Sequence, residues 1–212
     1  FGFGEITGIP LQGEIDGTVH PLRQWTAYSM GSIPMGQEVA VTPLQLANAY
    51  CAIANGGLLP RPRLVKAVRD AEGRTVQEVP VSMRRRTLSA ETMAVLRQTL
   101  RKVVTEGTGK AAKLEEYAIG GKTGTAQLKV NAEEHRAGMR GYSTTRYVSS
   151  FAGFAPADVP RIVVQVSVRE PQGAHYGGTV AAPVVREIVK RTLLYMRIPP
   201  AASSTEVRVA QR

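Results

Sequence analysis

The residues with the clearest chemical potential lie in one short stretch, Tyr117-Ala-Ile-Gly-Gly-Lys-Thr-Gly-Thr-Ala-Gln-Leu128. The stretch carries one ammonium group, on Lys122, and two hydroxyl groups, on Thr123 and Thr125. Residues two apart in a strand face the same side, so the two threonines would present their hydroxyls together. Gly124 lies between them without a side chain, which lets another backbone or a ligand approach closely. These groups predict a strand edge that receives an extended ligand ending in a carboxylate.

A phosphate-binding loop is the first alternative, because Gly121-Lys122-Thr123 also ends that motif. The motif requires a second glycine five residues earlier, and that position holds Glu116, an acid where a phosphate would need to approach. The pattern therefore excludes a phosphate loop. A lysine on an ordinary edge strand is the second alternative, and it stays open on this stretch alone because three-residue motifs often occur by chance.

Length, composition and charge limit the classes of protein to which this chain can belong. A length of 212 residues and an apolar fraction of 43% suit one medium globular domain or part of a larger one. The net charge of +10 is compatible with an acidic partner, but the basic residues are scattered. The tight run Arg84-Arg85-Arg86 has no aromatic residues between its members, so we expect no nucleic-acid binding.

The single cysteine, Cys51, excludes an intrachain disulfide and a thiolate metal site, and we expect neither a metal nor a cofactor. No apolar run approaches the roughly 20 residues that span a bilayer. The chain opens Phe1-Gly-Phe-Gly4 without an initiator methionine or a signal peptide, which indicates a fragment or a processed piece.

Local signals divide the first half of the chain. Residues 1–24 are rich in glycine and predict irregular structure, and residues 25–41 predict a loop or a short strand. Thr42 and Pro43 are typical of a helix start, so we expect a helix over about 42–55. Strands at 63–68 and 74–79 would form a peripheral hairpin, and Ser89 would cap a helix over about 90–106.

The second half predicts three antiparallel strands and a packed helix. The strand around Lys122 would lie beside a hairpin of strands at 147–154 and 161–168, after an exposed loop at 129–141 with a solvated His135. Thr179 would cap a helix over about 180–197, and residues 198–212 have the composition of a tail or linker. The fold class is α+β, a largely antiparallel sheet with packed helices. The apolar stripe of the last helix would comprise Val184, Val185, Ile188, Val189, Thr192, Leu193 and Met196.

Four separated stretches resemble the C-terminal part of the transpeptidase domain of class B penicillin-binding proteins. The resemblance implies a transpeptidase fold like that of penicillin-binding proteins and serine β-lactamases, incomplete here, with residues 1–197 as its C-terminal portion. The four stretches are Phe1-Gly-Phe-Gly…Thr7-Gly-Ile…Gly13-Glu14, Val41-Thr-Pro-Leu-Gln-Leu-Ala47 with Ala54-Asn-Gly-Gly57, Gly121-Lys-Thr-Gly-Thr-Ala-Gln127, and Tyr176-Gly-Gly-Thr-Val-Ala-Ala-Pro183.

The resemblance implies peptidoglycan D,D-transpeptidation, in which a serine attacks the D-Ala-D-Ala end of a stem peptide, and it implies that β-lactams bind. The family carries Ser-x-x-Lys and Ser-x-Asn motifs, and neither occurs in this sequence. The nearest matches, Ser82-Met-Arg-Arg85 and Ser143-Thr-Thr-Arg146, end in arginine, which stays protonated and cannot act as a base. By similarity the nucleophile belongs upstream of Phe1, and the isolated chain should be inactive.

The resemblance also assigns roles to the matching residues. Lys122 and Thr125 are the implied catalytic residues: Lys122 would polarise the site, and the Thr125 N–H would donate to the oxyanion. Thr123 and the Thr125 hydroxyl would hold the terminal carboxylate, and Tyr176-Gly-Gly178 is more simply a plain turn than a lining of the acceptor side. The implied substrate-binding set is Gly121, Thr123, Gly124, Thr125 and Gln127. For Gln127, an outward-facing side chain without a ligand is an equally good interpretation.

The implied partners are stem peptides, β-lactams, the missing N-terminal half of the same protein and a membrane glycosyltransferase. The implied location is the periplasmic or extracellular face of the bacterial inner membrane, with an N-terminal anchor outside this chain and a duty in cell division or cell shape. A catalytically inactive relative that binds wall material or a division or elongation partner stays open. A related carboxypeptidase or β-lactamase is less favoured, because Thr42-Pro-Leu-Gln-Leu-Ala47 and the stretch from Tyr176 match the transpeptidases.

Overall fold

The computed structural model describes residues 1–200, so most of the predicted tail, residues 201–212, lies outside the described residues. The chain forms two compact units, Phe1–Met93 and Ala94–Arg212. The boundary between them falls within helix α3 (Ala90–Thr105), and each unit is described by itself.

Helix α2 (Pro43–Ala54) anchors the first unit and confirms the helix predicted at 42–55. It starts with a capping box: Thr42 Oγ1 accepts the Gln45 N–H at 3.1 Å, and Gln45 Oε1 accepts the Thr42 N–H at 2.8 Å. The buried Gln45 amide also donates to the carbonyls of Glu5 and Asp16, at 2.9 and 2.7 Å. The Gln45 side chain therefore links helix α2 to two points of the irregular N-terminal segment.

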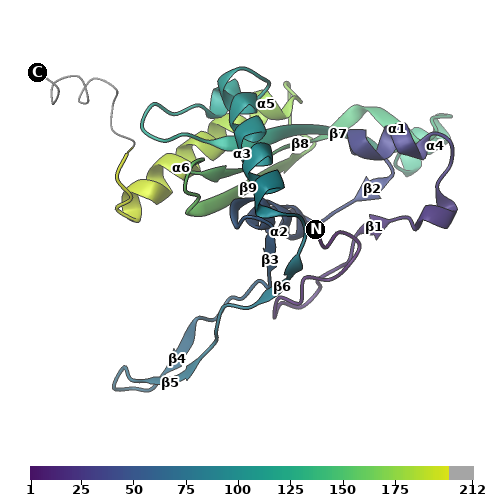
Figure 1. Ribbon diagram of the computed structural model, residues 1–212. Coiled ribbons are helices and arrows are strands. Elements are labelled where there is room, and N and C mark those ends of the chain that lie inside the picture. The colour runs from purple at the N-terminus through teal and green to yellow at the C-terminus, as the bar shows by residue number, and fades with distance from the viewer. Residues whose placement is uncertain (201–212) are drawn as a thin grey trace, which may run out of the picture. The chain divides into compact units, whose positions relative to one another are not determined.

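Short antiparallel pairs complete the first unit. The predicted hairpin exists with shorter strands and extends as an arm in Figure 1. The pairs are β1 (Thr18–Val19) with β2 (Val39–Ala40), β3 (Leu58–Pro60) with β6 (Met83–Arg86), and the hairpin β4 (Ala67–Arg69) with β5 (Thr75–Glu78).

Residues 25–41, predicted as a loop or a short strand, contain helix α1 (Ser29–Ser32) before β2. Ser29 Oγ donates to the Glu38 carboxylate at 2.8 Å, and Ser32 Oγ donates to the same group. These hydroxyls lower the pKa of Glu38 below its ordinary value. Hydrogen bonds between polar side chains stabilise this segment. The sequence therefore has no apolar periodicity from which helix α1 could have been predicted. The remaining 3-10 turns are η1 (Leu22–Gln24) and η2 (Ile33–Met35).

The second unit is built on a three-stranded antiparallel sheet in the order β7-β8-β9, which confirms the predicted arrangement. The strands are β7 (Gly120–Lys129), β8 (Tyr142–Ala155) and β9 (Ile162–Arg169). Strand β8 lies in the middle, so β7 is an edge strand among the described residues. Helix α6 (Ala182–Tyr195) runs along one face of this sheet (Figure 1).

The core of the second unit lies between the sheet and α6. Phe151 of β8 is fully buried there, together with Val185, Val189 and Leu193 of α6 at helical spacing. These three are the buried members of the predicted stripe of seven, whereas Val184 is 44% exposed and Ile188 39% exposed.

Two details at the ends of α6 differ from the sequence analysis. Thr179 does not cap α6, because it lies in the preceding short helix α5 (Gly177–Val180), and α6 begins at Ala182 with Pro183 in its first turn. Beyond α6, the Ile198 carbonyl accepts the Tyr117 hydroxyl at 2.8 Å and the Ile198 side chain packs against the core. The chain is thus held by the core as far as Ile198.

Helix α3 (Ala90–Thr105) confirms the second predicted helix. Ser89 Oγ accepts the Thr92 N–H at 3.2 Å at its start. Near its end, Val104 is buried in the core of the second unit. The 3-10 helix η3 (Lys110–Ala112) follows α3 and leads toward the site strand.

Residues 129–141 are not a plain exposed loop, because they contain helix α4 (Ala132–Arg136). Asn131 Oδ1 accepts the Glu134 N–H at 2.9 Å and Glu134 Oε2 accepts the Asn131 N–H at 2.8 Å, a second capping box. The sequence Asn-x-x-Glu was the available signal. His135 is exposed, in agreement with the predicted solvated position.

Buried charge fixes this connection to the sheet. Glu134 is buried and accepts hydrogen bonds from the Ser143 hydroxyl and from Arg146 Nη1, the latter at 3.2 Å. Arg146 also makes a two-point pair with Glu170, at 2.9 and 3.0 Å. The Ser143 hydrogen bond, followed by the Asn131 N–H, lowers the pKa of Glu134 below its ordinary value.

Candidate active site

The predicted site residues lie on the edge strand β7. Lys122 and Thr125 are exposed and Thr123 is partly buried. Strand β7 pairs with β8 alone among the described residues, so its other edge presents backbone N–H and C=O groups that the sheet does not use. An extended peptide could add itself to such an edge by main-chain hydrogen bonds.

The register of the sheet sets the directions of the side chains. Thr123 pairs with Phe151 and Thr125 with Ser149, both fully buried on β8. The two threonines therefore share one face, as the sequence predicts. Lys122 alternates with them, yet its Nζ donates to the Thr123 carbonyl at 2.9 Å and lies 3.5 Å from the Thr123 hydroxyl. The flexible lysine stem brings ammonium and hydroxyl together.

Both threonine hydroxyls have partners that the sequence analysis missed. Thr123 Oγ1 lies 2.8 Å from Thr108 Oγ1, in the segment that follows α3. Thr125 Oγ1 accepts the backbone N–H of Gly177 at 3.0 Å. The segment expected to be a plain turn thus begins helix α5 and touches the site strand. No local pattern announces either contact, because the partners lie far apart in the sequence.

The glycines of the strand have packing reasons of their own. A Cβ on buried Gly121 would lie 2.5 Å from a Phe151 ring carbon and 2.6 Å from the Ala152 carbonyl oxygen. A Cβ on Gly124 would lie 2.5 Å from Ser150 Oγ. The backbone and ring contacts require glycine at position 121 for the close fit of β7 on β8, whereas a Cβ at position 124 would displace the Ser150 hydroxyl.

Gln127, predicted either as a ligand contact or as an outward-facing side chain, makes an internal bond. Its Nε2 donates to the Ser143 carbonyl at 3.0 Å, across the β7–β8 pair. The side chain is partly buried. This contact ties Gln127 to the start of β8.

An aromatic stack holds the loop before α5 against the sheet. The Tyr147 and His175 rings are stacked with centroids 4.3 Å apart, and the Tyr176 ring lies 4.5 Å from His175. The Ser149 hydroxyl donates to the His175 carbonyl. These contacts place the backbone of Gly177 beside Thr125.

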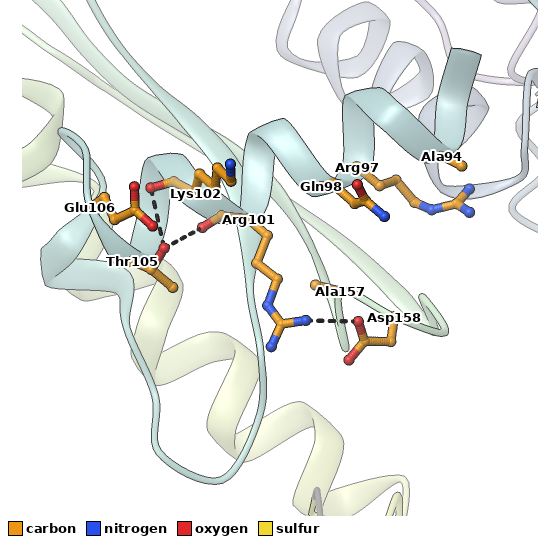
Figure 2. A pocket seen from close by; sticks show the side chains of 9 residues that line it. All are labelled: Ala94, Arg97, Gln98, Arg101, Lys102, Thr105, Glu106, Ala157 and Asp158. Carbon is orange, nitrogen blue, oxygen red and sulfur yellow. Dashed lines mark hydrogen bonds and ion pairs between the residues drawn. The ribbon is translucent and has the colours of Figure 1, made fainter. Parts of the chain in front are cut away.

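A surface hollow of about 480 Å³ lies elsewhere in the second unit, between α3 and the turn after β8 (Figure 2). An ion pair between Arg101 and Asp158, with an N–O distance of 3.0 Å, crosses it. None of the predicted site residues lines this hollow. Its lining residues are Ala94, Arg97, Gln98, Arg101, Lys102, Thr105, Glu106, Ala157 and Asp158.

Within residues 1–200, no group of His, Cys, Asp and Glu side chains is arranged to hold a metal ion. In the same part of the chain, every helix is too short or too polar to cross a bilayer.

Comparison with known proteins identifies the class to which this fold and edge strand belong. Residues 1–190 match the model of the family described as the penicillin binding protein transpeptidase domain. Since the match covers most of the 212 residues, the chain belongs to this family.

The relatives are longer than this chain. Stage V sporulation protein D of Bacillus subtilis is 39% identical over 208 residues, covering 97% of this chain and 31% of that protein. Penicillin-binding protein PbpB of Mycobacterium tuberculosis is 38% identical over 198 residues, covering 89% of this chain and 28% of that protein. The chain therefore spans about a third of the length of the relatives that it matches.

Solved structures confirm the predicted fold class. Penicillin binding protein 3 from Mycobacterium tuberculosis, complexed with aztreonam, is similar with a TM-score of 0.82 and 35% identity, over 94% of this chain and 45% of that chain. The same protein complexed with ampicillin gives a TM-score of 0.83 and 34% identity, over 96% and 45%. The fold is that of the transpeptidase domain, α+β with an antiparallel sheet.

Proposed function

We propose that this chain forms the Lys-Thr-Gly wall of the active site of a peptidoglycan D,D-transpeptidase. The observation that carries the proposal is the exposed edge strand β7, which presents the Lys122 ammonium and the hydroxyls of Thr123 and Thr125 beside unpaired backbone groups. Membership of the transpeptidase family supports it. A relative from Mesostigma viride, 32% identical over 193 residues, is named a peptidoglycan D,D-transpeptidase FtsI homolog.

In the proposed reaction, the stem peptide adds to the edge of β7 and its terminal carboxylate faces Lys122 and the threonine hydroxyls. A serine oxygen attacks the carbonyl of the D-Ala-D-Ala bond, the last D-Ala leaves, and an amine of a second stem peptide takes the acyl group. The Thr125 N–H donates to the oxyanion that forms. One such donor is typically worth about 2.7–4 kcal/mol in acyl transfer, so the placement of β7 controls the rate.

We propose that the nucleophile comes from a part of the protein outside these 212 residues. The support is the absence of Ser-x-x-Lys and Ser-x-Asn from the sequence, together with the greater length of the relatives. We also propose that β-lactams bind to the whole protein. The complexes of the similar structures with aztreonam and ampicillin support this. The proposal also includes an anchor outside this chain that holds the domain at the outer face of the inner membrane, and a glycosyltransferase partner in cell-wall synthesis.

A module that binds wall material or a partner without catalysis is the second candidate, because the sequence holds no nucleophile motif of its own. The two candidates differ in covalent chemistry. A fluorescent penicillin should label the whole protein at one serine and should leave residues 1–212 alone unlabelled. Labelling of the isolated chain would show that the nucleophile has been misplaced. A whole protein that binds penicillin reversibly without acylation would favour the binding module.

A further inference from the structure

The contact between Gly177 and Thr125 has a chemical consequence. A hydroxyl offers one O–H donor and two acceptor lone pairs, whereas a backbone N–H can only donate. Since the Gly177 N–H points at Thr125 Oγ1 over 3.0 Å, the oxygen accepts and the hydroxyl proton is directed elsewhere. Among the described residues Thr125 Oγ1 makes no other hydrogen bond, and the residue is exposed. The Thr125 hydroxyl proton therefore has no acceptor among the described residues and is available to a ligand.

The Thr123 hydroxyl differs from that of Thr125 in its hydrogen-bond partners. Thr123 Oγ1 shares a hydrogen bond with Thr108 Oγ1 at 2.8 Å and also accepts one from Lys122 Nζ at 3.5 Å. Either hydroxyl of the Thr108–Thr123 pair can be the donor, so Thr108 Oγ1 offers the Thr123 proton an acceptor within the protein. The Thr125 hydroxyl accepts from a backbone N–H and has no such acceptor among the described residues, which makes it the better placed of the two to donate to a ligand.

Close packing of the Gly177 backbone holds its N–H within hydrogen-bonding distance of Thr125 Oγ1. An ideal Cβ on Gly177 would lie 2.3 Å from the carbonyl oxygens of both Gly124 and Ser150, so no side chain fits there. A Cβ on Gly178 would lie 2.6 Å from the Thr108 carbonyl oxygen. The pair of glycines lets the start of α5 rest directly on the backbones of β7 and β8 and on the segment that contains Thr108.

We propose that Tyr176-Gly177-Gly178 is a positioning element that makes the Thr125 hydroxyl a dedicated hydrogen-bond donor to the terminal carboxylate of the substrate. A carboxylate only accepts, so a chain from the Gly177 N–H through the Thr125 O–H to the carboxylate has one consistent direction, and each bond polarises the next. Gly177 touches no substrate in this scheme and acts through Thr125. The inference rests on the proposed function and deepens it. It identifies the Thr125 hydroxyl as a group that favours substrates with an anionic terminus.

The test removes the N–H without adding a Cβ. In the whole protein, glycolic acid in place of Gly177 converts that amide to an ester. The matched control is the same replacement at Thr179, whose N–H donates to the Tyr176 carbonyl at 2.9 Å in the same turn and does not contact Thr125. The Gly177 ester also makes the Tyr176 carbonyl a weaker acceptor, and the control weakens the same turn by removing the Thr179 N–H that this carbonyl accepts. The measurement is the second-order rate of acylation by a penicillin and by its carboxyl methyl ester.

The Gly177 ester should slow acylation by the free penicillin about threefold to tenfold, the range expected for one lost hydrogen bond. The methyl ester, which has no anion, should be slowed less, and the Thr179 control should leave both rates unchanged. In a Thr125→Val background the Gly177 ester should change the rate by less than about twofold, because the two groups act in series.

An equal loss with and without the Thr125 hydroxyl, or an equal loss for both penicillins, would overturn the inference. A Gly177 ester that acylates at the parent rate would also overturn it. If Thr125→Val acylates at the parent rate, the role of Thr125 in the proposed function fails. If Thr125→Val acylates slowly while the Gly177 ester acylates at the parent rate, the inference about Gly177 fails and the proposed function stands.

Discussion

Replacing Lys122 with methionine should separate stability from function. The Lys122 side chain is exposed, and among the described residues it hydrogen-bonds only to the adjacent residue Thr123. Loss of such a surface contact changes the free energy of unfolding by no more than about 0.5 kcal/mol. For a domain of this size the Tm should therefore shift by no more than about 2 °C. The methionine keeps most of the apolar stem and removes the charge.

The functional loss should be much larger. A hydrogen bond from an ammonium to a carboxylate is worth about 1.5–3 kcal/mol, which corresponds to a rate loss of about 10- to 150-fold. The bare Coulomb energy at 4 Å and an effective dielectric constant of 20 would be about 4 kcal/mol. Since Lys122 is exposed, solvent and salt screen the charge, and the lower part of the range is expected.

The assay is the acylation rate of the whole protein by a fluorescent penicillin, measured together with its thermal melt. Lys129→Met is the matched control, because Lys129 is an exposed lysine at the far end of the same strand, and it should acylate within about twofold of the parent. Added salt should slow the parent more than Lys122→Met. Parent-like acylation by Lys122→Met would remove this lysine from the site, and a large drop in Tm would mean that the loss reflects folding.

Three further predictions concern the scaffold of the second unit. Leu193→Ala, at a fully buried position, should lower the free energy of unfolding by about 2–5 kcal/mol, whereas Leu194→Ala, at a position 57% exposed, should be nearly neutral in urea titrations. Similar costs would mean that α6 packs differently. Gly124→Ala should destabilise by about 1–3 kcal/mol because its Cβ meets Ser150 Oγ, and Ser150→Ala should restore most of the loss in thermal melts. No rescue would place the strain elsewhere. The folded-state pKa of Glu134 lies below 4.5, so its stabilising effect is complete above pH 4.5 and is lost as the pH falls through the folded-state value. Unfolding free energy should therefore fall more steeply with acid in the parent than in Glu134→Gln, and parallel curves would contradict the buried network.

The elements that the sequence predicted well carry their signals within a few residues. The start of α2 is marked by Thr42, Pro43 and Gln45, and the structure contains the corresponding capping box. The strands β8 and β9 were found because valine and aromatic residues dominate them, although β8 begins five residues before the predicted strand. A second capping box, Asn131 with Glu134, was equally visible and was overlooked because charged residues surround it.

Burial was harder to predict than secondary structure. The predicted stripe of α6 contained two adjacent apolar rows, and both suit a helix face. The structure buries the row of Val185, Val189 and Leu193, whereas Val184 and Ile188 stay exposed. The choice between rows depends on which side of the helix meets the sheet, and a helix pattern alone does not contain that information.

The sequence by itself determined the chemical groups of the candidate site: an ammonium and two hydroxyls on a strand, with no Ser-x-x-Lys or Ser-x-Asn motif in the 212 residues. Only the tertiary structure decided how those hydroxyls are partnered. Thr108 lies 15 residues from Thr123, and Gly177 lies 52 residues from Thr125. Caps and turns join neighbours along the chain, whereas these contacts arise because the sheet, the core beneath Phe151 and the aromatic stack bring distant backbones within hydrogen-bonding distance. The direction in which Thr125 donates is therefore a property of the packed fold.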